Sequence, residues 1–400
     1  MNIDTGKEME TQRTERDLRF DFFRGFALIC ICVNHTEAMA GYKVLGFLIL
    51  DPTGLYDNAM TFVFISGLMY GYVYEKIYLS HGLWMTWARS IVRSIQIYFF
   101  QIVLLPFIIG AAALFLLYGD LNETMEYLRL SPYLHGEGLA FVQYLTLYNY
   151  PQFFDILPLY ALLLLFMPIF LYGLNRSQTV TVMLAMLVWV QSGFWVVLRR
   201  RELLPFHNAG LYLTVWQYLF LLGMMFGFRK RMGTLRLSYS KKYLYPAIAW
   251  LLFIFVKEKM LFFINDYIFT FEPNSLSHIP FSLKIYLGPT RIFTFLILVY
   301  VVSYFVSKDS KLFQNKFGRA LITCGQNSLE VFSFGLFLTY VAIFLMQITN
   351  GGYGSMLIMD IGMVLLSVAF AYYLKWRKRE PWRRNPIDNQ PIKIGSTLLL

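Results

Sequence analysis

The chain has 400 residues, of which 57% are hydrophobic and 15% are charged, and its formal net charge is +11. Its mean hydropathy of +0.51 is far too high for a soluble domain of this length. The composition therefore excludes an ordinary soluble enzyme and predicts an all-α, polytopic integral membrane protein. The basic excess belongs mostly to loops that face anionic lipid and anionic ligands, so it requires no nucleic acid.

Apolar windows recur along the chain, each long enough to cross about 30 Å of hydrocarbon. They cover residues 20–40, 55–74, 92–118, 154–174, 179–198, 211–228, 243–263, 285–306, 320–347 and 356–376. We therefore expect about ten transmembrane helices around a polar cavity. The expected division is an N-terminal segment at 1–19, a transmembrane domain at 20–376 and a tail at 377–400.

Segments rich in Lys and Arg alternate with neutral or acidic segments. The basic ones are the Arg13, Arg16 and Arg19 stretch and residues 76–93, 229–242, 308–319 and 375–384. Basic loops stay in the cytoplasm, so both termini are expected there and the acidic segment 120–155 is expected outside. One exception is the run Arg199–Arg201 on the expected outer side, which either caps a helix or faces an anionic ligand.

Motifs of soluble enzymes and metal sites are absent from the sequence. Cys30, Cys32 and Cys324 all fall inside apolar windows and offer neither a disulfide framework nor a metal-ligand spacing. A phosphate-binding GxxxxGK[ST] loop, an HExxH motif and a GxSxG elbow are not present. Any chemistry must therefore come from polar groups within the membrane interior.

Arg24 and His35 are the most informative pair of such groups. Both lie in the first apolar window, and His35 is the only histidine that falls inside any window. Eleven steps of about 100° return to within about 20° of the start, so both side chains share one helix face, roughly 16 Å apart. Ionisable groups inside a membrane are costly and typically functional. The alternative is an interfacial anchor at Arg24 and a packing histidine at His35.

Other polar residues in or next to the windows are further candidates for the site. They are Asp57, Ser66, Arg89, Arg93, Asp155, Trp216, Gln217, Arg291, Asn327, Ser328 and Glu330. Arg89 and Arg93 share a helix face. They could equally be residues that anchor the helix at the cytoplasmic surface of the membrane. Arg291 equally suits a residue that snorkels to the interface or pairs with an acid such as Asp155. The long outer segments combine aromatic and polar residues, which suits sugars, although aromatic residues are also common at membrane interfaces.

Five blocks in the same order along the chain resemble one family of membrane enzymes. They are RDLRFDFFRGFALICICVNH at 16–35, YDNAMTFVFISG at 56–67, FDILPLYALLLLFMP at 154–168, VWQYLFLLG at 215–223 and NSLEVFSFGLFL at 327–338. In these blocks the chain resembles the acyltransferase-3 membrane O-acyltransferases, and especially the OpgC-type proteins that succinylate osmoregulated periplasmic glucans. The resemblance covers nearly all of the chain.

This resemblance implies an enzyme of the bacterial inner membrane with no tightly bound cofactor and with acyl-CoA, here succinyl-CoA, as a cytoplasmic co-substrate. It implies that Arg24 holds the donor and that His35 is the catalytic base. Arg89 and Arg93, which share a helix face, are candidates for further contacts with the phosphates of the donor. Asn34 and Met60 stand where acidic residues are expected, so Asp57 becomes the candidate that orients His35. The candidates for substrate binding are Asp155, Trp216, Gln217, Arg291 and Ser328.

Several alternatives stay open on the sequence alone. Buried Arg, Asp and His also build the substrate paths of transporters and exporters, although no pair of matching broken segments marks an inverted repeat. An acetyltransferase of another surface polysaccharide and a non-catalytic scaffold are further alternatives. The expected partners are acyl-CoA, a periplasmic glucan and the lipid bilayer, with a homodimer left open.

Overall fold

The computed structural model describes residues 17–46, 58–197, 212–236, 238–267 and 287–380, and every regular element in these ranges is a helix. In chain order the elements are α1 Leu18–Ala40, α2 Asn58–Phe115, α3 Asn122–Tyr127, α4 Ser131–Leu134, α5 Gly138–Leu145, α6 Ile156–Arg176, α7 Gln178–Val197, α8 Leu213–Arg231, α9 Lys241–Tyr267, α10 Pro289–Phe305, the 3-10 helix η4 Lys311–Phe313, α11 Lys316–Gln326, α12 Ser328–Ile348 and α13 Tyr353–Arg377. The predicted all-α class is confirmed.

Four helices of the described ranges are long and apolar enough to cross a membrane, namely α2, α6, α12 and α13. These helices support a membrane location. The described residues of the expected apolar windows lie mostly on helices, but the expectation of about ten crossings stays a prediction. Window 320–347 was expected as one segment, and the structure divides it between α11 and α12 at Asn327.

The second helix consists of two arms joined at a break. Gly82 has φ 77° and ψ −176°, which is far from helical geometry and is accessible to glycine because it has no Cβ. Tyr70 on the first arm and Ser90 on the second form a hydrogen bond of 2.7 Å between their hydroxyls. The basic segment 76–93, expected to be a loop, is therefore helical on both sides of Gly82. Lys and Arg are good helix formers, so a segment rich in them can remain helical. Positive charge at the expected edge of the membrane therefore does not require a loop.

The first arm of α2 packs against α8 through glycines four residues apart on both helices. A Cβ at Gly67 would lie 2.1 Å from the carbonyl oxygen of Phe220, and one at Gly71 would lie 2.1 Å from that of Met224. Gly223 and Gly227 of α8 meet α2 just as closely. Small residues at this spacing let membrane helices approach backbone to backbone. The contacts also fix the register, with the two helices parallel and position 67 level with position 220.

The first helix packs against α2, α11, α12 and α13. Gly25 of α1 and Gly325 of α11 bring the two backbones together, because a Cβ at Gly25 would lie 2.0 Å from the carbonyl oxygen of Leu321. A Cβ at Gly335 of α12 would lie 2.7 Å from the Sγ of Cys32, so this glycine leaves room for a side chain of α1. These contacts fix the position of α1 against α11 and α12.

The buried carboxylate of Glu37 secures the far end of α1. Glu37 is 2% exposed and accepts hydrogen bonds from the backbone N–H groups of Val44, Leu45 and Gly46 at 2.6 to 3.0 Å. These bonds join the last turns of α1 to the segment that follows it. Asp360 of α13 is also fully buried, and neither of its carboxyl oxygens has a hydrogen-bond partner among the described residues.

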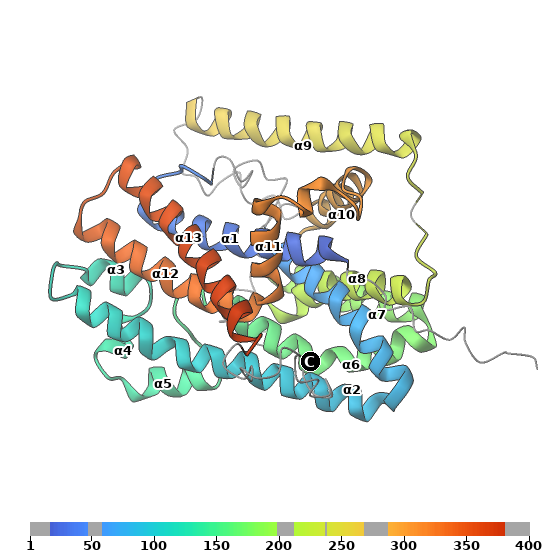
Figure 1. Ribbon diagram of the computed structural model, residues 1–400, viewed down its shortest axis with the longest axis horizontal. Coiled ribbons are helices and arrows are strands. Elements are labelled where there is room, and N and C mark those ends of the chain that lie inside the picture. Colours follow the sequence, from blue (N-terminus) through green and yellow to red (C-terminus); the bar gives the residue numbers. More distant parts are fainter. Residues whose placement is uncertain (1–16, 47–57, 198–211, 237, 268–286, 381–400) are drawn as a thin grey trace, which may run out of the picture.

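Figure 1 shows most of the long helices lying roughly along the long axis of the molecule. The short helices α3, α4 and α5 gather at one end of this axis, on the left of the view, and the bend of α2 lies at the opposite end. The basic last turn of α8, with Arg229, Lys230 and Arg231, lies at the same end as the bend. The end of the molecule with the bend of α2 therefore carries a cluster of positive charge on α8.

Candidate functional site

Arg24 and His35 stand on the single helix α1, as the spacing predicts, and both side chains are half-buried. The helix begins at Leu18 after Asp17, whose carboxylate caps the backbone N–H of Arg19. It ends before Gly41, which has φ 74°, a left-handed conformation common at helix C-termini. The helix is therefore continuous through both residues, and the separation of roughly 16 Å between them along the axis follows from its rise.

Arg24 points toward the first arm of α2. Its Nη2 donates a hydrogen bond of 3.2 Å to the hydroxyl of Ser66, and its guanidinium lies 5.8 Å from the ring centre of Phe62. Its Nε is buried and has no hydrogen-bond partner among the described residues. Leaving a buried donor unsatisfied costs about 1–3 kcal/mol, and more for a charged group. The arrangement therefore leaves Arg24 with capacity for an anionic ligand.

His35 lies against the segment that enters α6. The ring centres of His35 and Phe153 are 4.3 Å apart, with their planes at 30°. Phe153 has φ 70°, which is an unusual and strained conformation for a bulky residue. The hydroxyl of Tyr340 on α12 donates to the carbonyl oxygen of the adjacent Gln152. The Tyr340 ring also meets that of Phe153 at 6.4 Å, so α12 holds the segment that covers His35.

Asp155 follows two residues after Phe153 and immediately precedes α6. The residue as a whole is partly exposed, but its carboxyl is buried, and burial raises its pKa to about 6, against the opposing effects of a backbone hydrogen bond and the positive charge of Arg129. A carboxyl that changes charge near neutral pH beside an imidazole-bearing helix is typical of a functional site. Asp57, the other predicted acid, lies outside the described residues.

Trp216 and Gln217 are buried near the start of α8, which packs against the first arm of α2. Gln217 donates a hydrogen bond of 2.8 Å to the carbonyl oxygen of Ala185 on α7, but its Oε1 and the Nε1 of Trp216 have no partner among the described residues.

Further polar atoms without a described partner lie at the start of the same two helices. They belong to Asn58 on α2 and Thr214 on α8. Buried polar groups in proteins are nearly always paired, and exceptions call for an unseen water or ligand. The first turns of α2 and α8 therefore hold several buried polar atoms that a water molecule or a ligand could satisfy.

The remaining predicted residues are distributed over other parts of the molecule. Arg93 donates to Gln96 at 3.1 Å, and both Arg89 and Arg93 interact electrostatically with Tyr74. Arg291 is half-buried in the first turn of α10. Ser328 is buried at the start of α12, next to Asn327, whose amide oxygen accepts a 2.7 Å hydrogen bond from Lys378. Ser328 thus lies near the end of α13.

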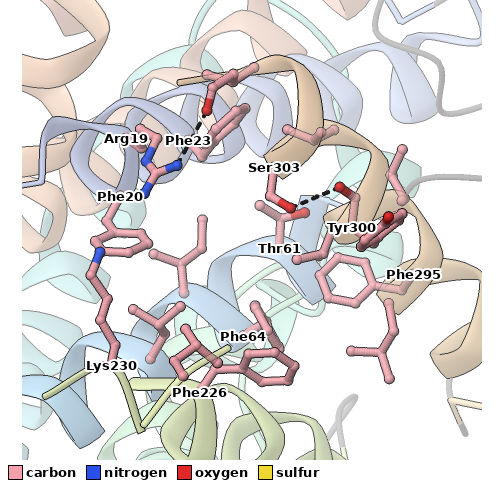
Figure 2. A pocket seen from close by; sticks show the side chains of 18 of the residues that line it. Arg19, Phe20, Phe23, Thr61, Phe64, Phe226, Lys230, Phe295, Tyr300 and Ser303 are labelled. Atoms are coloured by element: carbon pink, nitrogen blue, oxygen red, sulfur yellow. Dashed lines mark hydrogen bonds between the residues drawn. The ribbon is translucent and has the colours of Figure 1, made fainter. Parts of the chain in front are cut away.

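A cavity of about 630 Å³ lies on another face of α1, between α1, α2, α8 and α10. Figure 2 shows Arg19 and Lys230 along one edge of it, and the rings of Phe64, Phe226 and Phe295 on the other. Arg24 is not among the lining residues. The sequence did not predict this cavity or the contact of Phe153 with His35. Both depend on which helices pack together, and neither leaves a local pattern.

Comparison with protein families agrees with the resemblance carried by the five sequence blocks. The profile described as OpgC protein matches residues 16–379, which include Arg24, His35 and every described helix. The chain belongs to the OpgC protein family. Membership implies succinyltransferase activity that modifies glucans. No curated protein and no solved structure matches the chain.

Proposed function

We propose that the protein transfers a succinyl group from cytoplasmic succinyl-CoA to hydroxyl groups of a periplasmic glucan, with His35 as the general base. The observation that carries the proposal is the pair on α1. The buried Nε–H of Arg24 has no hydrogen-bond partner among the described residues, and His35 lies about 16 Å further along the same face of the helix. Arg24 would thus bind the acyl donor, and His35 would activate the acceptor hydroxyl at another depth in the membrane.

The reaction follows from ordinary acyl-transfer chemistry. The imidazole of His35 removes the proton of a glucan hydroxyl while its oxygen attacks the thioester carbonyl carbon. The carbon–sulfur bond then breaks, CoA leaves as a thiolate, and the imidazolium supplies the proton that makes the free thiol. An imidazole suits this work because its unperturbed pKa of about 6.5 lies near neutral pH, and positioned bases contribute about 100- to 10,000-fold in rate.

The donor is proposed to enter from the end with the bend of α2 and the basic end of α8. Positive charge at membrane-proximal segments is typical of the cytoplasmic side. Arg24 would bind the anionic or polar part of the donor that reaches its level, and Arg89 and Arg93 would attract the phosphates before entry. The cytoplasmic location of both termini and about ten crossings belong to this proposal.

The acceptor is proposed to enter from the end with α3, α4 and α5. Support comes from the aromatic cover of Phe153 on His35 and from Asp155 next to it. The unpaired polar atoms of Trp216 and Gln217 would hold the transferred group between the two ends. Asp57 remains the proposed partner that orients His35, and Arg291 and Ser328 remain proposed contacts of the substrate.

Sealed inside-out membrane vesicles loaded with unmodified glucan test this proposal. Labelled succinyl-CoA added outside should yield succinylated glucan inside, without any ion gradient. Right-side-out vesicles should yield none until they are made permeable. Arg24→Gln should raise the KM for succinyl-CoA, whereas Lys242→Gln, at the exposed start of α9, should not. A need for an ion gradient, or equal activity in both orientations, would contradict the proposal and favour a transporter.

A further inference from the structure

The cavity between α1, α2, α8 and α10 does not belong to the face that carries Arg24 and His35. Phe23 lines the cavity, and because it precedes Arg24 by one residue, its side chain points about 100° away around α1. Phe20 and Phe26 also line the cavity, at about 40° and 160° from Arg24 around the helix. The cavity therefore faces mostly away from Arg24, and neither Arg24 nor His35 lines it.

One end of the cavity is basic. Every charged side chain that lines it is positive, namely Arg19, Lys230 and Lys308. Lys230 lies close enough to Arg19 and Lys308 to be repelled by both. Asp17 offsets one charge by bonding to Arg19, at 2.9 and 3.0 Å, and to Lys230. The three cations against one carboxylate leave an excess of positive charge that an anion would balance.

Asp17 stays ionised in this cluster. Burial alone would raise its pKa, but the hydrogen bonds and charges of Arg19 and Lys230 outweigh burial and hold the pKa well below its ordinary value. The cluster is also fixed in position. Arg19 donates to the carbonyl oxygen of Val306 at 3.3 Å, and Lys230 lies 4.2 Å from the ring centre of Phe20. The cations are thus held at the mouth of an aromatic cavity (Figure 2).

The interior of the cavity offers few groups for a polar ligand. The hydroxyl of Ser303 is bonded to the carbonyl oxygen of Tyr300 at 2.8 Å, and that of Tyr300 to the carbonyl oxygen of Ser238 at 3.0 Å. Much of the remaining wall is Phe, Leu, Ile and Val. The pantetheine arm of CoA carries two amides that would be buried here with few partners, at a cost of several kcal/mol. A hydrocarbon chain has no such cost.

We propose that this cavity binds one anionic phospholipid of the inner leaflet, with its phosphate between Arg19, Lys230 and Lys308 and an acyl chain among the phenylalanines. Basic pockets between membrane helices on the cytoplasmic side are known to suit anionic head groups. Each methylene buried contributes about 0.8 kcal/mol, so the chain supplies affinity and the cations supply selectivity. The site would join α1 and α10 on the side away from the catalytic face.

The full-length protein in nanodiscs tests this proposal by native mass spectrometry after mild delipidation. Palmitoyl-oleoyl phosphatidylglycerol should remain bound, and phosphatidylcholine with the same chains should be lost. Lys308→Glu should weaken phosphatidylglycerol binding about 30-fold, through loss of one contact and an equal repulsion. Lys311→Glu is the matched control, because Lys311 is exposed in the same segment and does not line the cavity.

A second variant tests the apolar half of the site without altering its charge. Val299→Trp should fill the space that the acyl chain occupies and abolish retention, while thermal stability in detergent reports that the fold persists. Equal retention of both lipids, or equal retention by Lys308→Glu and Lys311→Glu, would overturn the proposal. Displacement of the lipid by succinyl-CoA at its KM would also overturn it, and would assign the cavity to the donor.

Discussion

Replacing Phe153 should lower succinyl transfer without weakening donor binding. The Phe153 ring lies 4.3 Å from the His35 ring, and aromatic contacts of this kind contribute about 0.5–1.5 kcal/mol beyond area burial. If the contact fixes the productive orientation of the imidazole, its loss in Phe153→Ala should lower kcat about 2- to 13-fold. The KM for succinyl-CoA should not change, because Arg24 stands on another part of α1.

The backbone of Phe153 supplies an internal control. Its φ of 70° is strained for alanine as it is for phenylalanine, whereas glycine adopts it freely. Phe153→Gly should therefore be more stable than Phe153→Ala by about 1 kcal/mol but equally impaired in kcat. Initial rates in vesicles at equal protein abundance provide the measurement. Full activity in Phe153→Gly would show that the backbone matters and the ring does not, which would refute the reasoning.

Three further predictions concern the helix contacts, the carboxyl next to His35 and the choice of acyl group. Gly71→Leu should strongly lower the thermal stability in detergent, because even a Cβ there would lie 2.1 Å from a backbone oxygen of α8. Gly110→Leu, where a Cβ would meet no atom of a neighbouring element within 4 Å, should not, and equal loss of stability in both variants would contradict the close glycine contacts between α2 and α8. Asp155 has its folded pKa raised from 3.8 to about 6, so wild-type stability should fall relative to Asp155→Asn as pH rises from about 4 to about 7. A stability difference between these two proteins that does not vary with pH would contradict the burial of this carboxyl. Arg291→Met should depress succinyl transfer more than acetyl transfer, because a distal carboxylate within the membrane needs a cation. Equal loss of both would remove Arg291 from acyl recognition.

The sequence predicts well what depends on local periodicity. The spacing of Arg24 and His35 requires only the pitch of a helix, and α1 runs through both. The described residues of the apolar windows likewise lie mostly on helices. The break at Asn327 falls in the polar stretch Gln326-Asn327-Ser328, which lies within a mostly apolar window. There Asn327 leaves helical geometry, with φ −117° and ψ 41°, and its side-chain amide donates a 2.9 Å hydrogen bond to the carbonyl oxygen of Thr323.

Features that depend on packing could not be predicted in this way. Phe153 and His35 are separated by more than a hundred residues, and nothing near either of them indicates their contact. The cluster of Arg19 and Lys230 around Asp17 likewise joins the first helix to α8. In the sequence these residues are ordinary members of basic segments, because positive charge at a membrane edge gives no information about the partner it meets.

The role of His35 is tested most directly by the glucan that the protein modifies. Periplasmic glucans from cells that produce the wild-type protein should carry succinyl groups in their mass spectra. Glucans from cells with His35→Ala, at equal membrane abundance and unchanged thermal stability, should carry about 100-fold fewer or none. Succinylation close to the wild-type level in the His35→Ala cells would contradict the assignment of His35 as the catalytic base.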